Sequence, residues 1–172
     1  LCYLCGKFSK AMELFYTYLQ SPLGWLEICG TDTHVTSINF KEEGGRESEN
    51  LPRHLKNCST QLSEYFDGKR RSFDVKLEPD GTVFQQMVWS ELQKINFGDT
   101  LSYGDIARKL NDDRLTRAVG NANGKNPIAV IIPCHRVIGE NGSLTGYAGG
   151  MWRKKWLLEM EGRVSGKNLT LF

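Results

Sequence analysis

The chain has 172 residues, of which 40% are hydrophobic and 24% are charged. This length suits one hydrophobic core or two small ones, so it argues against a large multidomain protein. No apolar run reaches the roughly 18 residues that a membrane span needs, and the first residues lack the pattern of a secretory signal. We therefore expect a soluble protein without a membrane partner.

Cysteine usage and charge indicate where the protein works. Five cysteines are an odd number in a chain long enough to fold without disulfides, which favours a reducing, intracellular compartment. We expect the cytoplasm in a prokaryote and the nucleus in a eukaryote. The net charge of +2 does not by itself indicate a nucleic-acid partner, because clustering matters more than the total.

The N-terminal part alternates apolar and polar residues in three segments, at 15–19, 25–29 and 35–40. A Ser-Pro-Leu-Gly turn at 21–24 helps to separate them, so the pattern predicts a small antiparallel sheet. Apolar residues then recur at helical spacing from Leu51 to Phe66, with Asn50 as the expected N-cap. This half is expected to be a sheet with a helix packed on it.

A second part begins near Thr82, which has the spacing of a capping box with Gln85. The helix that starts there is expected to run to Phe97-Gly98. The predicted fold class is therefore α/β, with an N-terminal sheet-plus-helix part and a mostly helical C-terminal part. Its loose N-terminal segment, two domains and C-terminal tail are placed at 1–10, 11–78, 79–162 and 163–172.

Two short helices follow in the C-terminal part. Ser102 can cap the first, a polar turn comes at 111–113, and the second ends at Gly124. This is the outline of a helix-turn-helix, although ordinary helical hairpins share it. The polar face of the second helix carries residues at spacings suited to phosphates or a groove: Arg114, Arg117, Asn121 and Lys125. A solvated surface explains the same cluster.

The chemical centre follows an apolar run from Ile128 to Ile132, which predicts a buried strand or extended core segment. Pro133 and then Cys134, His135 and Arg136 come next. A lone cysteine is usually an inert core residue. Here imidazole and guanidinium neighbours can both lower the thiol pKa, and the thiolate is the nucleophile. The segment therefore favours an activated cysteine.

A glycine-rich loop around Tyr147 comes next, and its backbone can lie close to a flat ligand. The helix after the loop is expected to end at Glu161-Gly162. An acidic side chain in the last turn faces the negative end of the helix dipole, so we expect Glu161 to have a cationic partner, unless it is solvated at a frayed end. The residues expected on the buried face are Trp152, Trp156, Leu157 and Met160.

Three stretches carry a likeness to a known family: Asn126-Pro127, Ile131 to Val137 and Gly146 to Gly150. They resemble the O6-alkylguanine-DNA alkyltransferases (methylated-DNA–protein-cysteine methyltransferases). The likeness covers all of residues 82–162 and is looser over 11–78, where the family has a ribonuclease-H-like domain. Further agreement lies at Phe84 to Trp89, Ser102-Tyr103, Arg117 to Gly120 and Trp156 to Gly162.

The resemblance implies DNA repair by irreversible transfer of an alkyl group from O6-alkylguanine to Cys134, once per molecule and without metal or cofactor. O4-alkylthymine stays open as a second substrate. In this family His135 takes the thiol proton through a water, and Glu161 stabilises the resulting imidazolium. Asn126 connects the segment before the cysteine to the active-site turn.

The resemblance also implies that a monomer binds double-stranded DNA through the minor groove and flips the damaged nucleotide into a pocket. Arg117 fills the vacated space, Tyr103 crowds the 3′ phosphate and meets the base, and Tyr147 packs on the base. Ala148 stands where some members have serine, and its backbone amide contacts the guanine oxygen. The other predicted contacts to DNA or base are Gly120, Asn121, Arg136 and the carbonyl of Val137.

Two other hypotheses use the same features. A non-catalytic protein that binds alkyl lesions lacks the nucleophile, and Cys134 argues against it. A helix-turn-helix regulator leaves the segment from Pro133 to Arg136 unexplained. Some family members bind zinc, but the spacing of the candidate ligands matches no closed zinc pattern, so we expect no metal at Cys2, Cys5, Cys29 and His34.

Overall fold

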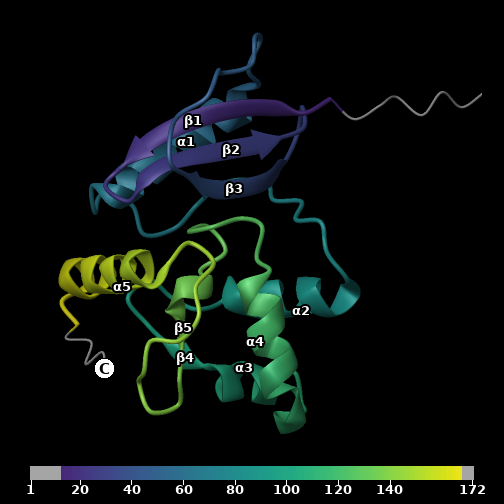
Figure 1. Cartoon of the computed structure of the whole chain (residues 1–172), viewed down its shortest axis with the longest axis vertical. Coiled ribbons are helices and arrows are strands. Elements are labelled where there is room, and N and C mark those ends of the chain that lie inside the picture. Colours follow the sequence, from purple (N-terminus) through teal and green to yellow (C-terminus); the bar gives the residue numbers. More distant parts are fainter. Residues whose placement is uncertain (1–12, 168–172) are drawn as a thin grey trace, which may run out of the picture.

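The computed structural model of the chain describes residues 13–167. Figure 1 shows a sheet with a helix behind it, placed above a group of helices. The loose segment predicted at 1–10, with Cys2 and Cys5, lies outside the described residues, as does the end of the predicted tail. No helix within the described range is long and apolar enough to cross a membrane.

The N-terminal part is an antiparallel sheet in the order β1-β2-β3. Its strands are β1 Phe15–Ser21, β2 Gly24–Gly30 and β3 Val35–Lys41. Alternate side chains such as Leu26 and Ile28 are buried, because successive residues of a strand point to opposite faces. Helix α1, Arg53–Phe66, covers the buried face with Leu55 and Leu62. The predicted sheet and helix are confirmed.

The predicted cap of α1 is wrong. Asn50 has a φ of 54° and lies before the helix, whose N-cap is Pro52 without a side-chain cap. Leu51, between them, is buried. Pro52 therefore sets the start of the helix through its fixed φ, and no capping side chain is used.

The C-terminal part consists of short helices and one parallel pair of strands, with two 3-10 turns. Thr82 and Ser102 both form complete capping boxes, as predicted for Thr82 and in the position predicted for Ser102. The elements are α2 Val83–Leu92, β4 Leu101–Ser102, α3 Tyr103–Lys109, η1 Asp113–Leu115, α4 Thr116–Gly124, η2 Cys134–Arg136, β5 Val137–Ile138 and α5 Met151–Ser165.

The predicted ends of two helices are wrong, and so is the predicted burial of one side chain. Helix α2 stops at Leu92, and the chain then turns toward Gly98, which has a φ of 76°. Helix α5 continues past Glu161 to Ser165, so Glu161 lies within the helix and not at its end. Trp152 is 55% exposed, because it stands in the first turn of α5 with the Arg153 guanidinium over its ring.

The apolar run before the cysteine is buried, but it is not a strand. Ile131 N donates to Ala129 O and Ile132 N to Ile128 O, so the run folds into tight turns. Val130 has a φ of 71°, which is rare for a β-branched residue and marks a backbone held by its surroundings. Ile128 alone forms a parallel bridge, with Ile38 of β3.

The sheet fixes the position of this run. Ile38 N donates to Pro127 O, and Ala129 N donates back to Ile38 O, both near 3.0 Å. A second bridge joins Val35 to Leu77. Buried side chains from both parts form one hydrophobic cluster that includes Cys134. The N-terminal sheet and the segment that carries the cysteine therefore form one packed unit.

Candidate functional site

Cys134 opens the 3-10 turn η2 directly after Pro133. Its side chain is buried, and Asn126 Nδ2 donates to Sγ at 3.1 Å. Burial raises the pKa of the Cys134 thiol, and the hydrogen bond from Asn126 offsets part of that rise. The resting sulfur is therefore a protonated thiol that already has a donor aimed at it.

Asn126 connects the turns on both sides of the apolar run. Its Nδ2 also contacts Ile132 O at 2.8 Å and Ile128 O at 3.3 Å, and its Oδ1 accepts from Ile128 N at 3.0 Å. One amide group thus holds the Ile128–Ile132 turn and Cys134 in a single arrangement. This is the linking position that the resemblance implied for Asn126.

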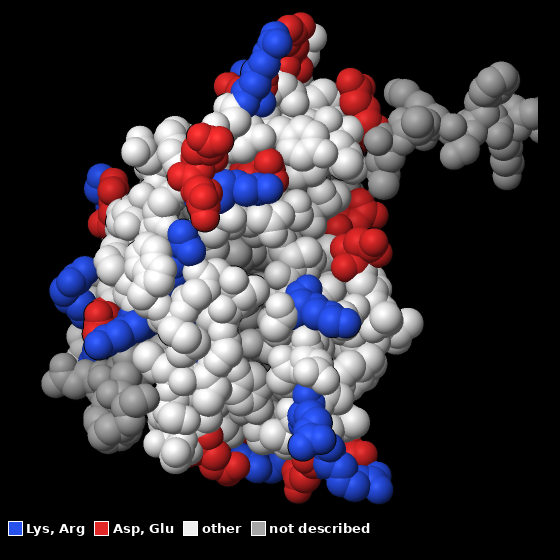
Figure 2. Space-filling model, viewed as in Figure 1, with Lys and Arg blue, Asp and Glu red and all other residues white. Residues whose placement is uncertain are grey.

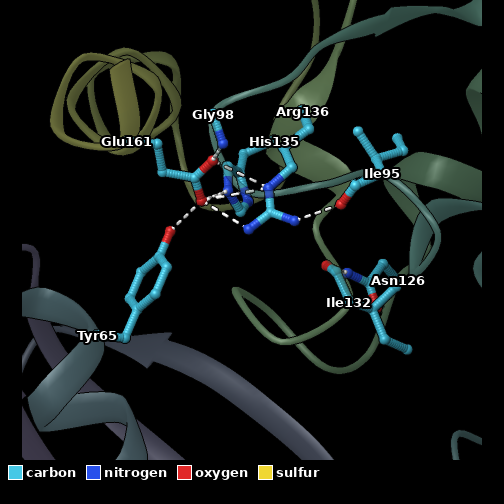
Figure 3. Close-up of polar contacts among 8 residues, drawn as sticks. All are labelled: Tyr65, Ile95, Gly98, Asn126, Ile132, His135, Arg136 and Glu161. Carbon is cyan, nitrogen blue, oxygen red and sulfur yellow. Dashed lines mark hydrogen bonds and ion pairs between the residues drawn. The ribbon is translucent and has the colours of Figure 1, made fainter. Parts of the chain in front are cut away.

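Glu161 is the centre of a fully buried polar cluster, shown in Figure 3. Its Oε1 accepts from Tyr65 Oη at 2.6 Å, from His135 Nε2 at 3.0 Å and from Arg136 Nη2 at 2.8 Å. Its Oε2 accepts from Gly98 N and Arg136 Nε, both at 3.0 Å. Burial alone raises the pKa of Glu161, but His135 and Arg136 together hold that pKa well below its usual range.

The ionised carboxylate fixes the tautomer of His135. A carboxylate only accepts hydrogen bonds, so Nε2 carries the hydrogen and Nδ1 keeps a free lone pair. Nδ1 is buried and has no partner among the described residues. Burial lowers the pKa of His135, against the opposite effect of Glu161. His135 is therefore a neutral imidazole whose Nδ1 can take a proton.

Arg136 supplies the cation that Glu161 was expected to need, and its predicted role at the DNA is wrong for this structure. Its side chain is only 7% exposed. Nε and Nη2 donate to Glu161, and Nη1 donates to Ile95 O at 2.6 Å. These bonds point the guanidinium into the protein, where it cannot reach a phosphate or a base edge.

The predicted base-contacting residues lie around the loop that follows β5. Tyr103 Oη donates to Thr145 O at 3.3 Å, which ties the start of α3 to this loop. Tyr147 is half-buried against Phe40 of β3, and its hydroxyl is buried without a partner in the described part of the chain. Ala148 is exposed. The structure thus brings Tyr103 and Tyr147 to the same loop.

Helix α4 carries two of the four residues predicted for one polar helix face. Arg114 lies in η1, where it pairs with Asp112, and Lys125 follows the end of α4. Arg117 and Asn121 are exposed, while Val119 on the opposite side is buried. Gly120 faces the ring of Tyr103, which a Cβ would approach to 3.8 Å. Figure 2 shows basic side chains, with acidic ones among them, at the lower end of the molecule, where Figure 1 places α3 and α4. This surface can meet a phosphate backbone.

Comparisons with known proteins now decide the family. Residues 14–79 match the ribonuclease-like domain of 6-O-methylguanine DNA methyltransferase, and residues 83–163 match its DNA-binding domain. A methylated-DNA–protein-cysteine methyltransferase from Methanosarcina acetivorans is 43% identical over 156 residues, which cover 87% of this chain and 99% of that protein. The chain belongs to the 6-O-methylguanine DNA methyltransferase family.

Solved structures of methyltransferases agree with this assignment. The Mycobacterium tuberculosis O6-methylguanine methyltransferase is 42% identical, with a TM-score of 0.80 over 92% of this chain and 98% of that one. A structure of Mycobacterium tuberculosis OGT in complex with DNA is 45% identical, with a TM-score of 0.79 over 87% and 93%. The predicted family and fold class are confirmed.

Two buried polar residues of this methyltransferase were missed by sequence reasoning. Tyr65, at the end of α1, looked like one more core position, yet its hydroxyl donates to Glu161. Lys154 lies in a basic stretch that is typical of a solvated helix, yet it is fully buried. Its Nζ donates to Val137 O at 2.6 Å and to Thr145 O at 2.7 Å. No pattern in the sequence distinguishes either residue.

Lys154 bears on the predicted role of Val137. The Val137 carbonyl was expected to accept from the base, and here it accepts from Lys154. A carbonyl oxygen has a second lone pair, so one acceptor site is left for a ligand. Burial lowers the pKa of Lys154 to about 8, while the nearby Cys134 acts in the opposite direction.

The candidate zinc ligands do not meet in the described part of the methyltransferase. Residues 13–167 contain no group of three or more His, Cys, Asp or Glu side chains that could hold a metal ion. Cys29 is a buried free thiol near Thr36, and His34 contacts Thr33. Cys2 and Cys5 lie outside this range.

Proposed function

We propose that this protein repairs DNA by moving an alkyl group from O6 of guanine to Sγ of its own Cys134, in one irreversible turnover. The observation that supports this most directly is the buried Cys134, which accepts from Asn126 and is followed in the chain by the His135–Glu161 pair. The family supports the same reaction, since relatives from Methanosarcina acetivorans and Mycolicibacterium paratuberculosis are named for methylated DNA and a protein cysteine.

The chemistry begins with loss of the thiol proton. His135 Nδ1 takes it by way of a water, and the imidazolium that forms is stabilised by the Glu161 carboxylate on the other nitrogen. Asn126 donates to the sulfur, and the ammonium of Lys154 also favours the thiolate electrostatically. These groups offset the cost of a charged sulfur in a buried site.

The thiolate then attacks the alkyl carbon in line. The S–C bond forms as the bond from that carbon to guanine O6 breaks, and guanine leaves with the electron pair and takes up a proton. The thioether left on Cys134 is too poor a leaving group to be displaced in turn. Each protein molecule therefore acts once, and the step itself calls for no metal or diffusible cofactor.

DNA reaches the site by nucleotide flipping, since an alkylated guanine inside a duplex is out of reach. We propose that α4 enters the minor groove as part of a monomer, with Arg117 filling the vacated space and Asn121 and Gly120 beside it. Tyr103 and Tyr147 then enclose the base. The exposure of Arg117 and the closeness of Tyr103 to the loop support this arrangement.

Two further assignments belong to the same proposal. We place the boundary between an N-terminal and a C-terminal domain at residue 79, in the segment that connects α1 to α2. We place the protein in the cytoplasm of a prokaryote or the nucleus of a eukaryote. The free thiols of Cys29, Cys58 and Cys134 support a reducing compartment.

The decisive test is intact-protein mass spectrometry after mixing the protein with a duplex that contains O6-methylguanine. We expect a gain of one methyl group, mapped to Cys134, that stops at one equivalent. Cys134→Ser is the control and should gain nothing. Turnover beyond one equivalent, or demethylation by the serine variant, contradicts the mechanism. Binding to the lesion without any mass gain favours a non-catalytic damage binder.

A further inference from the structure

The N-terminal sheet reaches the substrate loop through Arg153, in the first turn of α5. Arg153 Nε donates to Leu23 O at 2.8 Å, in the turn between β1 and β2. Its Nη1 donates to Gly149 O at 2.6 Å, in the loop that carries Tyr147 and Ala148. One half-buried guanidinium thus joins backbone oxygens of the N-terminal sheet and of the loop before α5.

Aromatic contacts strengthen the same connection. The Arg153 guanidinium lies 4.6 Å from the ring centre of Phe40 in β3. The Phe40 ring meets Tyr147 edge-on at 6.4 Å, and a Cβ at Gly149 would come within 2.7 Å of it. The loop backbone at Gly149 therefore lies against the ring of Phe40, a side chain of β3. Figure 1 shows α5 and this loop beneath β3.

The chemistry of these partners suits arginine in particular. Its partners are two carbonyl oxygens in different directions and the faces of Phe40 and Trp152. A planar guanidinium has donors along its edge and a face that stacks on rings, whereas an ammonium is a point charge. A lysine at this position keeps the charge but cannot hold both oxygens and both rings at once.

We infer that Arg153 is a positioning residue for alkyl transfer, through which the N-terminal sheet sets the placement of the base-binding loop at Tyr147–Gly149. The inference rests on the proposed function, because it takes Tyr147 and the amide of Ala148 as contacts to the flipped base. The N-terminal half contributes no reacting group to the site. It acts on the reaction by fixing where the base lies relative to Cys134.

Single-turnover kinetics test this assignment with Arg153→Ala and Arg153→Lys. The matched control is Lys155→Ala. Lys155 is an exposed residue of the same helix, and its Nζ lies 3.8 Å from Glu159 Oε1. We expect both Arg153 variants to lose about tenfold or more in the rate constant at saturating duplex, since small misplacements of a reacting group have effects of this order. The number of methyl groups accepted per folded protein should stay at one.

The free base O6-methylguanine is the second substrate. Because the loop acts on the base itself, the rate with the free base should fall by a similar factor to the rate with duplex. Duplex affinity should change little. Phe40→Leu should lower the same rate constant, and its effect should not add fully to that of Arg153→Lys, since the two side chains are in contact.

The possible results distinguish failure of the proposed function from failure of the inference about Arg153. If the wild-type protein accepts no methyl group, the proposed function fails and this inference with it. If the wild-type protein reacts and the Arg153 variants keep its rate constant, losing only the active fraction, Arg153 is merely structural and the inference is overturned. A loss confined to duplex, with a normal free-base rate, assigns Arg153 to DNA binding and also overturns it.

Discussion

Lys154 shows how a single buried charge connects stability with chemistry. Its side chain is fully buried, and its partners are the neutral carbonyl oxygens of Val137 and Thr145. A buried ammonium without a counter-ion is costly to keep charged, and this is why its pKa falls to about 8. The same charge favours the Cys134 thiolate. The site thus retains a destabilising group that assists the reaction.

A pH experiment tests this account of Lys154. Between pH 8 and 10.5 the unfolded lysine holds a proton that the folded lysine has released, so raising the pH favours the folded state. We expect the free energy of unfolding of the wild type, minus that of Lys154→Met, to rise by up to about 3 kcal/mol across this range. Urea unfolding of both proteins from pH 7.5 to 10 measures the difference. A difference that stays constant with pH contradicts a depressed pKa.

At the scale of elements, the exposed face of α4 lies apart from the buried polar cluster of Glu161. Arg117 is exposed on the outer face of this helix, and the polar cluster of Glu161 lies inside the protein. Gly120 on the same helix faces the ring of Tyr103, so α4 also contacts the residue whose hydroxyl bonds the loop. Changes on the outer face should therefore affect duplex DNA alone.

Arg117→Ala tests this separation. We expect repair of duplex to slow at least tenfold, because only duplex requires a side chain to replace the flipped base, an event that costs a few kcal/mol. Reaction with free O6-methylguanine should keep its rate. The control is Lys94→Ala, an exposed residue just after α2, which should leave both rates unchanged. Equal losses on both substrates, which is the pattern expected for Arg153, remove Arg117 from this role.

The elements that sequence predicted correctly are set by neighbouring residues. Thr82 and Ser102 start their helices with bonds to residues three positions on, so their sequence alone contains the signal. The prediction of a strand or extended segment at Ile128–Ile132 failed, because apolar content predicts that residues are buried and does not predict the conformation of their backbone. The turns of this segment depend on Asn126 and on Ile38, which is distant in sequence. The end of α2 likewise depends on contacts beyond the helix.

The residues of the candidate site likewise fall into those that the sequence and the resemblance predict and those that only the fold shows. Cys134, His135 and Asn126 stand close together in sequence, and the resemblance to a family adds Glu161 from α5. The resemblance implied a contact of Arg136 with DNA or base, and only the fold shows its side chain turned toward Glu161. Tyr65 looks like an ordinary apolar helix position until the two halves are packed together.

For the whole molecule, the reaction adds volume to a core that both halves share. Cys134 is 6% exposed and belongs to the hydrophobic cluster that also contains Ile38 and Leu55 of the N-terminal half. We expect an added methyl group to press on close-packed neighbours or on the Asn126 amide, and overpacking of this kind costs about 1–3 kcal/mol. The alkylated protein should therefore be less stable than the resting one.

Thermal unfolding before and after stoichiometric reaction measures this. We expect the methylated protein to have a Tm lower by roughly 2–12 °C, the shift that a loss of this size produces in a domain of this length. Cys134→Ser, mixed with the same oligonucleotide, controls for bound DNA and should show no such drop. An unchanged or higher Tm after methylation means that the site has room for the product.

The protonated, buried state of the Cys134 thiol has a further consequence for a reagent that is consumed by use. Oxidants and small electrophiles react mainly with exposed thiolates, and Cys134 at rest is neither exposed nor ionised. In the proposed mechanism the sulfur becomes nucleophilic only once its proton has left toward His135. The fold thus protects the thiol of the unused protein from side reactions, and each molecule stays able to repair its one lesion.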